Sequence, residues 1–271
     1  MPPLRSLFAN ALFAIAVLVA TNAHAAEPLC EKTVRWNNDP PYSVRDAQGK
    51  ITGFYVDLVK EILTKMNCTM KLQEMPWARA LSELEAGRID ILPGALKTSD
   101  RDRFALFSDP INSSPNILFM KKTAIDHFNL KNLADIPKIN FRLGVQVNVA
   151  YGAEFDQLMK KPTFLKQLTT VYKRHNAWKM VHIDRIDGLI VDEVTGLLEL
   201  KELHLDSSIS KTNLVVSSSP GLVAFSKKTI DESFIEGFNQ QLKAMISSGA
   251  YAKIRERHIP CKLSLRTLGC K

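Results

Sequence analysis

Short β-rich runs alternate with amphipathic helical stretches along most of this chain. Apolar residues recur at helical spacing from Val56 to Met66, which predicts a helix opened by Gly53. Pro76 and Gly87 then bound a second helical stretch. The predicted elements of this half are strands at residues 33–36, 70–74 and 89–92 and helices at 53–66 and 77–85. Such alternation predicts an α/β architecture with largely parallel sheets.

The same alternation restarts further along the chain. Residues 141–145 and 186–191 have the composition of strands, and residues 152–160 that of a helix. Residues 231–257 form a long helical pattern with a break at Ser247-Ser248-Gly249. Two α/β units, each with its own strands, predict two lobes with a cleft between them.

The first 25 residues differ in composition from the rest. Arg5 is followed by an apolar run from Ala11 to Ala20 and then by Ala23-His24-Ala25. This order is typical of a cleavable signal peptide. A membrane anchor is the alternative, but the run has about half of the ~20 apolar residues that a span needs. We therefore predict cleavage after Ala25 and an exported, periplasmic protein.

The charge of the chain raises the question of nucleic-acid binding. Lys and Arg number 36 against 28 Asp and Glu, a formal charge of +8. The basic residues are scattered among acids, and no arginine-rich stripe interleaved with aromatic residues is present. We expect a solvated basic surface and no nucleic-acid partner.

The chain contains four cysteines, an even number that in an exported protein indicates disulfides. Cys30 lies just before the first predicted strand and Cys68 just before the second. In a βαβ unit these strands are parallel and usually adjacent, so their amino ends lie side by side. We predict the pairs Cys30–Cys68 and Cys261–Cys270. The spacings fit no zinc pattern, so we predict neither a metal site nor a cofactor.

Several short motifs resemble those of one known family. In chain order they are Pro40-Pro41-Tyr42, Gly49-Lys50-Ile51-Thr52-Gly53-Phe54 with Asp57, Gly87-Arg88-Ile89-Asp90, Thr98-Ser99-Asp100-Arg101, Phe107-Ser108-Asp109-Pro110, Leu143-Gly144-Val145-Gln146, Arg185-Ile186-Asp187-Gly188-Leu189-Ile190-Val191-Asp192-Glu193 and Gly249-Ala250-Tyr251-Ala252-Lys253-Ile254. The ordered set resembles family three of the bacterial extracellular solute-binding proteins, the polar-amino-acid receptors of ABC importers.

The resemblance implies a two-lobed periplasmic-binding-protein fold of type II. Lobe 1 would comprise residues 26–113 and 218–271, and lobe 2 residues 114–217. Two hinge crossings would fall near residues 112–115 and 217–220, which are rich in Ser and Pro.

Candidate ligand-binding residues follow the predicted strands, where the loops of parallel sheets converge. Arg101 offers a planar fork for a carboxylate, which is the role that the resemblance implies; a surface arginine is the alternative. Asp192 would pair with the ligand's ammonium group or cap the helix after it, or do both. Trp77 would form a wall of the site or pack in the core. Gly94 lies in the loop after the third strand.

Three positions depart from the family's pattern. Asp39 replaces the aromatic residue that usually stacks on the ligand, and Leu96 replaces a hydroxyl residue. Asn148-Val149-Ala150 replaces a Gly-Thr-Thr turn, although Asn148 can keep the left-handed backbone. The added charge of Asp39 makes a cationic or amine-bearing ligand more plausible. The missing aromatic face could come from Trp36, Tyr42 or Tyr151.

These observations predict a monomeric protein that captures an amino-acid-like or amine-bearing solute for a membrane ABC permease. A sensory partner of a membrane receptor is one alternative. A cyclohexadienyl-dehydratase-like enzyme is another, but the acids that it would need, Asp39 and Glu154, lie in no recognisable dehydratase context. We therefore predict a binding protein and not an enzyme.

Overall fold

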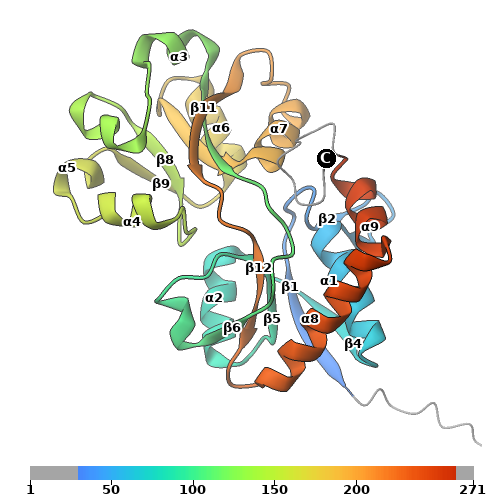
Figure 1. The fold of residues 1–271 in the computed structure, drawn as a ribbon. Helices are drawn as coiled ribbons and strands as arrows, with labels where there is room; N and C mark the ends of the chain where they lie inside the picture. Colours follow the sequence, from blue (N-terminus) through green and yellow to red (C-terminus); the bar gives the residue numbers. More distant parts are fainter. Residues whose placement is uncertain (1–29, 261–271) are drawn as a thin grey trace, which may run out of the picture.

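The computed structural model describes residues 30–260 and consists of two lobes, each built on a five-stranded sheet (Figure 1). The predicted signal peptide and the predicted Cys261–Cys270 pair lie outside the described residues. Two long segments run between the lobes, one in each direction.

The first sheet has the order β4-β1-β5-β12-β6. Its strands are β1 (Glu31–Trp36), β4 (Thr69–Glu74), β5 (Ile91–Ala95), β6 (Ala105–Phe107) and β12 (Leu222–Ser226). β1 is parallel to β4 and β5, whereas β12 is antiparallel to β5 and β6. The helices of this first lobe are α1 (Phe54–Lys65), α2 (Trp77–Ala86), α8 (Glu232–Ser247) and α9 (Ala250–His258). A short hairpin, β2 (Val44–Arg45) and β3 (Ile51–Thr52), precedes α1.

The second sheet has the order β11-β7-β10-β8-β9. Its strands are β7 (Asn116–Lys121), β8 (Leu143–Gln146), β9 (Leu168–Val171), β10 (Gly188–Asp192) and β11 (Ile209–Ser217). The helices of this second lobe are α3 (Lys122–Phe128), α4 (Ala153–Leu158), α5 (Pro162–Leu165), α6 (Arg174–His182) and α7 (Glu193–Glu202). Strands β8, β9 and β10 are parallel, and β7 is antiparallel to β10 and β11. The predicted fold class is confirmed, with antiparallel strands added to each parallel core.

Helix α1 forms where its apolar periodicity predicts. Leu58, Val59, Ile62 and Leu63 are fully buried against the first sheet, and burying such a side chain contributes roughly 1.5–3 kcal/mol. Gly53 precedes the helix with a φ of 127°, and a Cβ there would lie 2.6 Å from the Tyr42 carbonyl oxygen. Glycine is therefore required at this turn.

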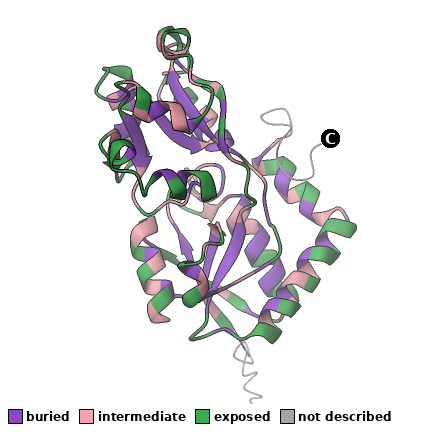
Figure 2. Cartoon of the chain, turned by 60° about the vertical axis from the view of Figure 1, so that its left-hand side comes forward, coloured by how far each residue is buried: buried purple, intermediate pink, exposed green. Residues whose placement is uncertain are grey.

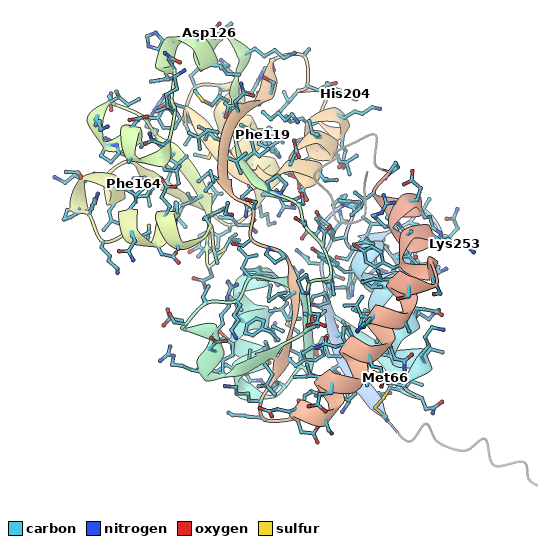
Figure 3. All side chains as sticks on the ribbon, in the orientation of Figure 1. Met66, Phe119, Asp126, Phe164, His204 and Lys253 are labelled. Carbon is cyan, nitrogen blue, oxygen red and sulfur yellow. A yellow bond between two sulfur atoms is a disulfide. The ribbon has the colours of Figure 1, made fainter. Side chains whose placement is uncertain are left out.

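Each lobe has its own apolar core between sheet and helices (Figure 2). In the second lobe, Phe119 of β7 packs edge-on against Trp178 of α6, with ring centroids 5.4 Å apart. Side chains fill the space around Phe119 and Phe164 (Figure 3). These cores make each lobe a stable platform for the loops between them.

The two crossing segments contact each other. The backbone N–H of Gly221 donates to the carbonyl of Asn112 over 2.9 Å, and Asn112 and Gly221 form an isolated antiparallel bridge. The chain leaves the first sheet after β6 and returns to it at β12. The division of the chain after residues 113 and 217 stays a prediction.

The Cys30–Cys68 disulfide is confirmed, with Cα atoms 4.5 Å apart. Its neighbours Glu31 and Thr69 are paired in the parallel register of β1 and β4. The cysteines therefore lie at the amino ends of adjacent strands, as the βαβ argument requires.

Candidate functional site

A cavity of about 170 Å³ lies between the two lobes and is lined by residues of both. At ~15 Å³ for each water, this space would hold roughly ten water molecules, which suits a small ligand. It lies beyond the carboxyl ends of β1, β5, β8 and β10, where open parallel sheets bind their ligands. The charged residues of its lining are Arg35, Asp39, Arg101, Arg174 and Asp192.

Arg101 begins a short 3₁₀-helix, Arg101–Arg103, in the loop after β5. It is buried, and its Nη1 and Nη2 atoms donate to the carbonyls of Leu96 and Asn148 over 2.8 and 3.0 Å. Burial lowers the pKa of Arg101 to about 10, although the charge of Asp156 opposes this. Within residues 30–260, Arg101 forms no ion pair. It is therefore a buried cation in the wall of the cavity and not a surface arginine.

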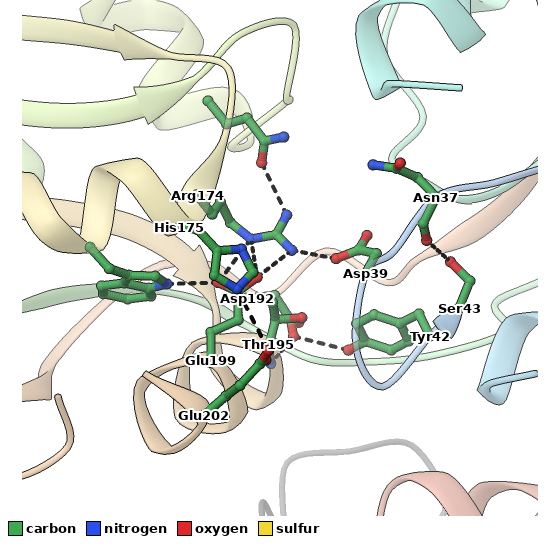
Figure 4. Close-up of polar contacts among 12 residues, drawn as sticks. Asn37, Asp39, Tyr42, Ser43, Arg174, His175, Asp192, Thr195, Glu199 and Glu202 are labelled. Atoms are coloured by element: carbon green, nitrogen blue, oxygen red, sulfur yellow. Dashed lines mark hydrogen bonds and ion pairs between the residues drawn. The ribbon is translucent and has the colours of Figure 1, made fainter. Parts of the chain in front are cut away.

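Asp192 ends β10 and caps α7. Its Oδ1 accepts a hydrogen bond of 2.9 Å from the backbone N–H of Thr195 and one of 3.0 Å from the Tyr42 hydroxyl (Figure 4). Burial raises the pKa of Asp192, although these hydrogen bonds oppose it. The capping role is confirmed, and the ammonium-binding role stays a prediction.

Trp77 lies at the start of α2 and lines the cavity. Its indole N–H donates to the Asn148 carbonyl over 3.0 Å. The guanidinium carbons of Arg35 and Arg101 each lie over its ring, 5.6 Å from the centroid. Trp77 also packs against the smaller core of the first lobe, so the packing role is confirmed, and its role as a wall against the ligand stays a prediction.

Asn148 adopts the predicted left-handed backbone, with a φ of 57°. Its carbonyl accepts hydrogen bonds from both Arg101 and Trp77, which belong to the other lobe. Val149 and Ala150 line the cavity beside it. The departure from the family's turn thus preserves the backbone but presents apolar side chains in place of hydroxyls.

Asp39 lines the cavity, and its carboxylate has an ion-pair partner that the sequence does not reveal. Arg174, the first residue of α6, forms an ion pair with Asp39 across the cavity (Figure 4). The Arg174 guanidinium also donates to Glu199 over 2.8 Å and to the Gln146 side chain over 3.2 Å. Glu199 in turn accepts from the Trp178 indole over 2.7 Å. The Asp39 carboxylate is therefore held by Arg174, and its effect on a cationic ligand stays a prediction.

The electrostatics of Arg174 reflect these partners. Burial by itself lowers the pKa of Arg174, but the charges and hydrogen bonds of Asp39 and Glu199 outweigh burial and raise the pKa. Arg174 and Arg35 were not among the predicted site residues. Neither lies in a motif, and no local pattern marks them as parts of a site.

The three aromatic candidates have different positions. Trp36 is 4% exposed and does not line the cavity. The guanidinium carbon of Arg45 lies over its ring, 4.8 Å from the centroid. Tyr42 and Tyr151 do line it. Tyr42 stacks on Tyr55 with centroids 4.4 Å apart and an interplanar angle of 14°. Of these three candidates, the two tyrosines and not Trp36 can offer an aromatic face to the cavity.

Gly94 lies in the cavity wall with a φ of 81°. A Cβ at this position would lie 2.6 Å from the Tyr55 ring, so glycine allows the backbone to approach the tyrosine pair. Of the eight predicted ligand-binding residues, only Trp36 and Asn148 are outside the lining, and Asn148 contributes its carbonyl to the wall.

Comparison with known proteins agrees with this fold. Residues 33–260 match the model of the family described as bacterial extracellular solute-binding proteins, family 3. The histidine-binding periplasmic protein of Salmonella typhimurium is 23% identical over 255 residues, which cover 89% of this chain and 93% of that protein. The arginine-binding periplasmic protein of Mannheimia haemolytica is 25% identical over 221 residues, 80% and 86% of the two chains.

An ancestral arginine-binding protein, solved with arginine bound, has a similar structure. Its TM-score is 0.72 at 23% sequence identity, over 86% of this chain and 100% of that chain. The fold is therefore that of the two-lobed, type II periplasmic binding proteins. The chain belongs to family 3 of the bacterial extracellular solute-binding proteins. Within residues 30–260, no helix has the length and apolar character that a membrane span requires.

Proposed function

We propose that this protein is a periplasmic receptor that captures a small amino-acid-like or amine-bearing ligand between its lobes and delivers it to an ABC importer. The observation that carries the proposal is the placement of Arg101 and Asp192 in one cavity. A guanidinium and a carboxylate are complementary to the carboxylate and the ammonium of an amino acid. The names of the relatives, which specify histidine and arginine, support an amino acid as the ligand class.

The two groups come from different lobes. Arg101 follows β5 of the first sheet, and Asp192 ends β10 of the second. A ligand that contacts both groups therefore bridges the lobes and favours the closed arrangement. Contacts already cross the cavity from Arg101 and Trp77 to the Asn148 carbonyl.

Closure would be a rotation about the two crossing segments. The contacts that line the cavity between the lobes are mainly polar, although Val194 and Leu198 of α7 also pack against the apolar core of the first lobe. Opening would break hydrogen bonds across the cavity and the Arg174–Asp39 ion pair. This arrangement supports a hinge mechanism over a local change of loops.

A thermal-shift screen of the exported protein against amino acids, polyamines and small peptides tests the proposal. A true ligand at a hundred times its Kd should stabilise the protein by ~2.7 kcal/mol. Small-angle scattering with that ligand should show a smaller radius of gyration. If no amine-bearing compound raises the melting temperature, or a confirmed ligand causes no compaction, the proposal is wrong.

The delivery step needs a separate experiment in cells. Deleting the gene should abolish uptake of the radiolabelled ligand at concentrations near its Kd, and restoring it should recover uptake. Uptake that persists unchanged would contradict import and favour the sensory role.

A further inference from the structure

Arg35 is a buried cation in the wall of the cavity. It lies in β1, between β4 and β5, and is 7% exposed. Its Nε donates to the Met75 carbonyl over 3.1 Å. Neither of its terminal nitrogens has a hydrogen-bond partner within residues 30–260, and the side chain forms no ion pair with that part of the chain. A buried charge without an ionic partner is costly, which favours binding of an anionic group beside it.

The other charges of the lining are already assigned. Arg174 is paired with Asp39 and Glu199. In the proposed function, Arg101 receives the ligand's carboxylate and Asp192 its ammonium group. Among the charged residues that line the cavity, Arg35 is left without an ionic partner from the described residues. An amino acid with an uncharged side chain would not provide one either.

The surroundings of Arg35 favour an anion. Burial lowers its pKa, the charge of Asp39 opposes that, and the charge of Arg174 adds to it. Arg174 is shared between Asp39 and Glu199, and among the described residues Asp39 forms its ion pair with Arg174 and not with Arg35, so the charge of Asp39 acts on Arg35 only at longer range. A ligand whose side chain is cationic would bring another positive charge toward Arg35 and would be repelled.

The geometry puts Arg35 within reach of the same ligand as Arg101. Both guanidinium carbons lie 5.6 Å from the centroid of the Trp77 ring, so they are at most twice that distance apart. Both residues line one cavity. One small molecule with two acidic groups could therefore contact both arginines.

We propose that Arg35 is a second anion-binding point and that the ligand is an amino compound with a second carboxylate, such as an acidic amino acid. This inference rests on the proposed function and specifies its ligand class. It differs from what the names of the histidine- and arginine-binding relatives would suggest.

Isothermal titration calorimetry on the exported protein tests the inference with matched ligands. L-glutamate is compared with L-glutamine, L-aspartate with L-asparagine, and all four with L-arginine. The acids should bind at least tenfold more tightly than their amides, and L-arginine should bind most weakly. Because each acid and its amide have nearly the same shape, the ratio isolates the second carboxylate. Equal affinity for acid and amide, or preference for L-arginine, would overturn the inference.

The variants Arg35→Met and Arg35→Lys then identify the residue responsible. Arg35→Met should weaken binding of the acid about a hundredfold and leave that of the amide within a few-fold, because only the acid needs the cation. Arg35→Lys should retain part of the preference for the acid. Equal losses for acid and amide in a folded Arg35→Met variant would make Arg35 structural and refute the assignment.

The two proposals fail in different ways. If neutral or basic amino acids bind tightly and depend on Arg101, the proposed function stands and the assignment of Arg35 falls. If no amino acid of any class binds, both fall. The acid-to-amide ratio on the unaltered protein decides the question even if Arg35→Met does not fold.

Discussion

Arg174 and Asp39 form an ion pair across the cavity, although 135 residues separate them in the chain. Arg174 begins α6 of the second lobe, and Asp39 lies in the loop after β1 of the first. The pair therefore joins the lobes on one side of the cavity. Behind it, the Glu199 side chain is 2% exposed and depends on the same guanidinium.

This arrangement predicts unequal effects for the two partners. Arg174→Ala should reduce the free energy of unfolding by roughly 3–5 kcal/mol, because it leaves the buried Glu199 carboxylate without its cation. Asp39→Asn should cost much less, since Arg174 keeps Glu199. Urea denaturation measures both, with Arg79→Ala as the control because Arg79 is exposed. Equal losses at Arg174 and Asp39 would contradict the dependence on Glu199.

Arg101 should control affinity for the ligand's carboxylate. Arg101→Met should weaken binding by roughly 2–5 kcal/mol, from about 30-fold to several thousand-fold, because the carboxylate loses its fork. Arg101→Lys should recover only part of this, since lysine lacks the bidentate geometry. Calorimetry with the best ligand measures the losses. Unchanged affinity in a folded Arg101→Met variant would show that Arg101 does not bind the ligand's carboxylate.

The capping role of Asp192 and its proposed ammonium-binding role can be separated by one pair of variants. Asn caps helices about as well as Asp, so Asp192→Asn should keep the hydrogen bond to Thr195 and most of the stability. It should nevertheless lose affinity for amine-bearing ligands, because the charge is gone. Asp192→Ala should lose that affinity and also ~0.5–2 kcal/mol of stability. Calorimetry and thermal melts report the two properties. Full affinity in Asp192→Asn would refute ammonium binding.

The Cys30–Cys68 disulfide should contribute measurably to the free energy of unfolding. The double variant Cys30→Ala with Cys68→Ala should reduce the free energy of unfolding by ~2–4 kcal/mol, because the loop between these residues is no longer closed. Urea denaturation measures the loss. Non-reducing peptide mapping of the unaltered protein tests the Cys261–Cys270 pair at the same time. A peptide that links Cys68 to Cys261 would contradict both assignments.

The elements that the sequence predicts well are those with strong local patterns. The apolar spacing from Val56 to Met66 places a helix at 53–66, and α1 spans Phe54–Lys65. The argument from βαβ connectivity correctly pairs Cys30 with Cys68. In each case the deciding information lies within a short stretch of chain or in a general rule of connectivity.

The charge balance of the cavity could not be predicted in the same way. The sequence reveals Asp39 as an unusual charge but says nothing of Arg174, whose position opposite Asp39 depends on how the two lobes meet. Arg35 occupies a strand position that reads as part of a buried run. Such pairings over long sequence separations arise from tertiary structure, which single-sequence patterns do not encode.

Asp57 links two helices of the first lobe through contacts whose contribution to stability should depend on pH. Its carboxylate lies 2.7 Å from His258 Nε2 and 3.4 Å from Arg257 Nη1, so it ties α1 to α9. Burial by itself raises the pKa of Asp57, but His258, Thr52 and Arg257 outweigh burial and hold the pKa below its ordinary value of 3.8. A carboxyl group whose pKa is depressed in the folded protein stabilises the fold at pH values above its ordinary pKa. This contribution is lost as the pH falls through the pKa of the folded protein.

Asp57→Asn should therefore destabilise the protein at pH 7 and progressively less below pH ~4, because protonated aspartic acid and asparagine are both uncharged. Urea denaturation of the unaltered protein and the variant at several pH values between 7 and 3 measures the difference. Asp126→Asn is the control, since Asp126 is exposed at the outer end of the second lobe (Figure 3). The difference in the free energy of unfolding between the unaltered protein and Asp57→Asn should decrease as the pH falls. The control variant should differ little from the unaltered protein at any pH. A constant difference down to pH 3 would mean that Asp57 acts through packing and not through its charge.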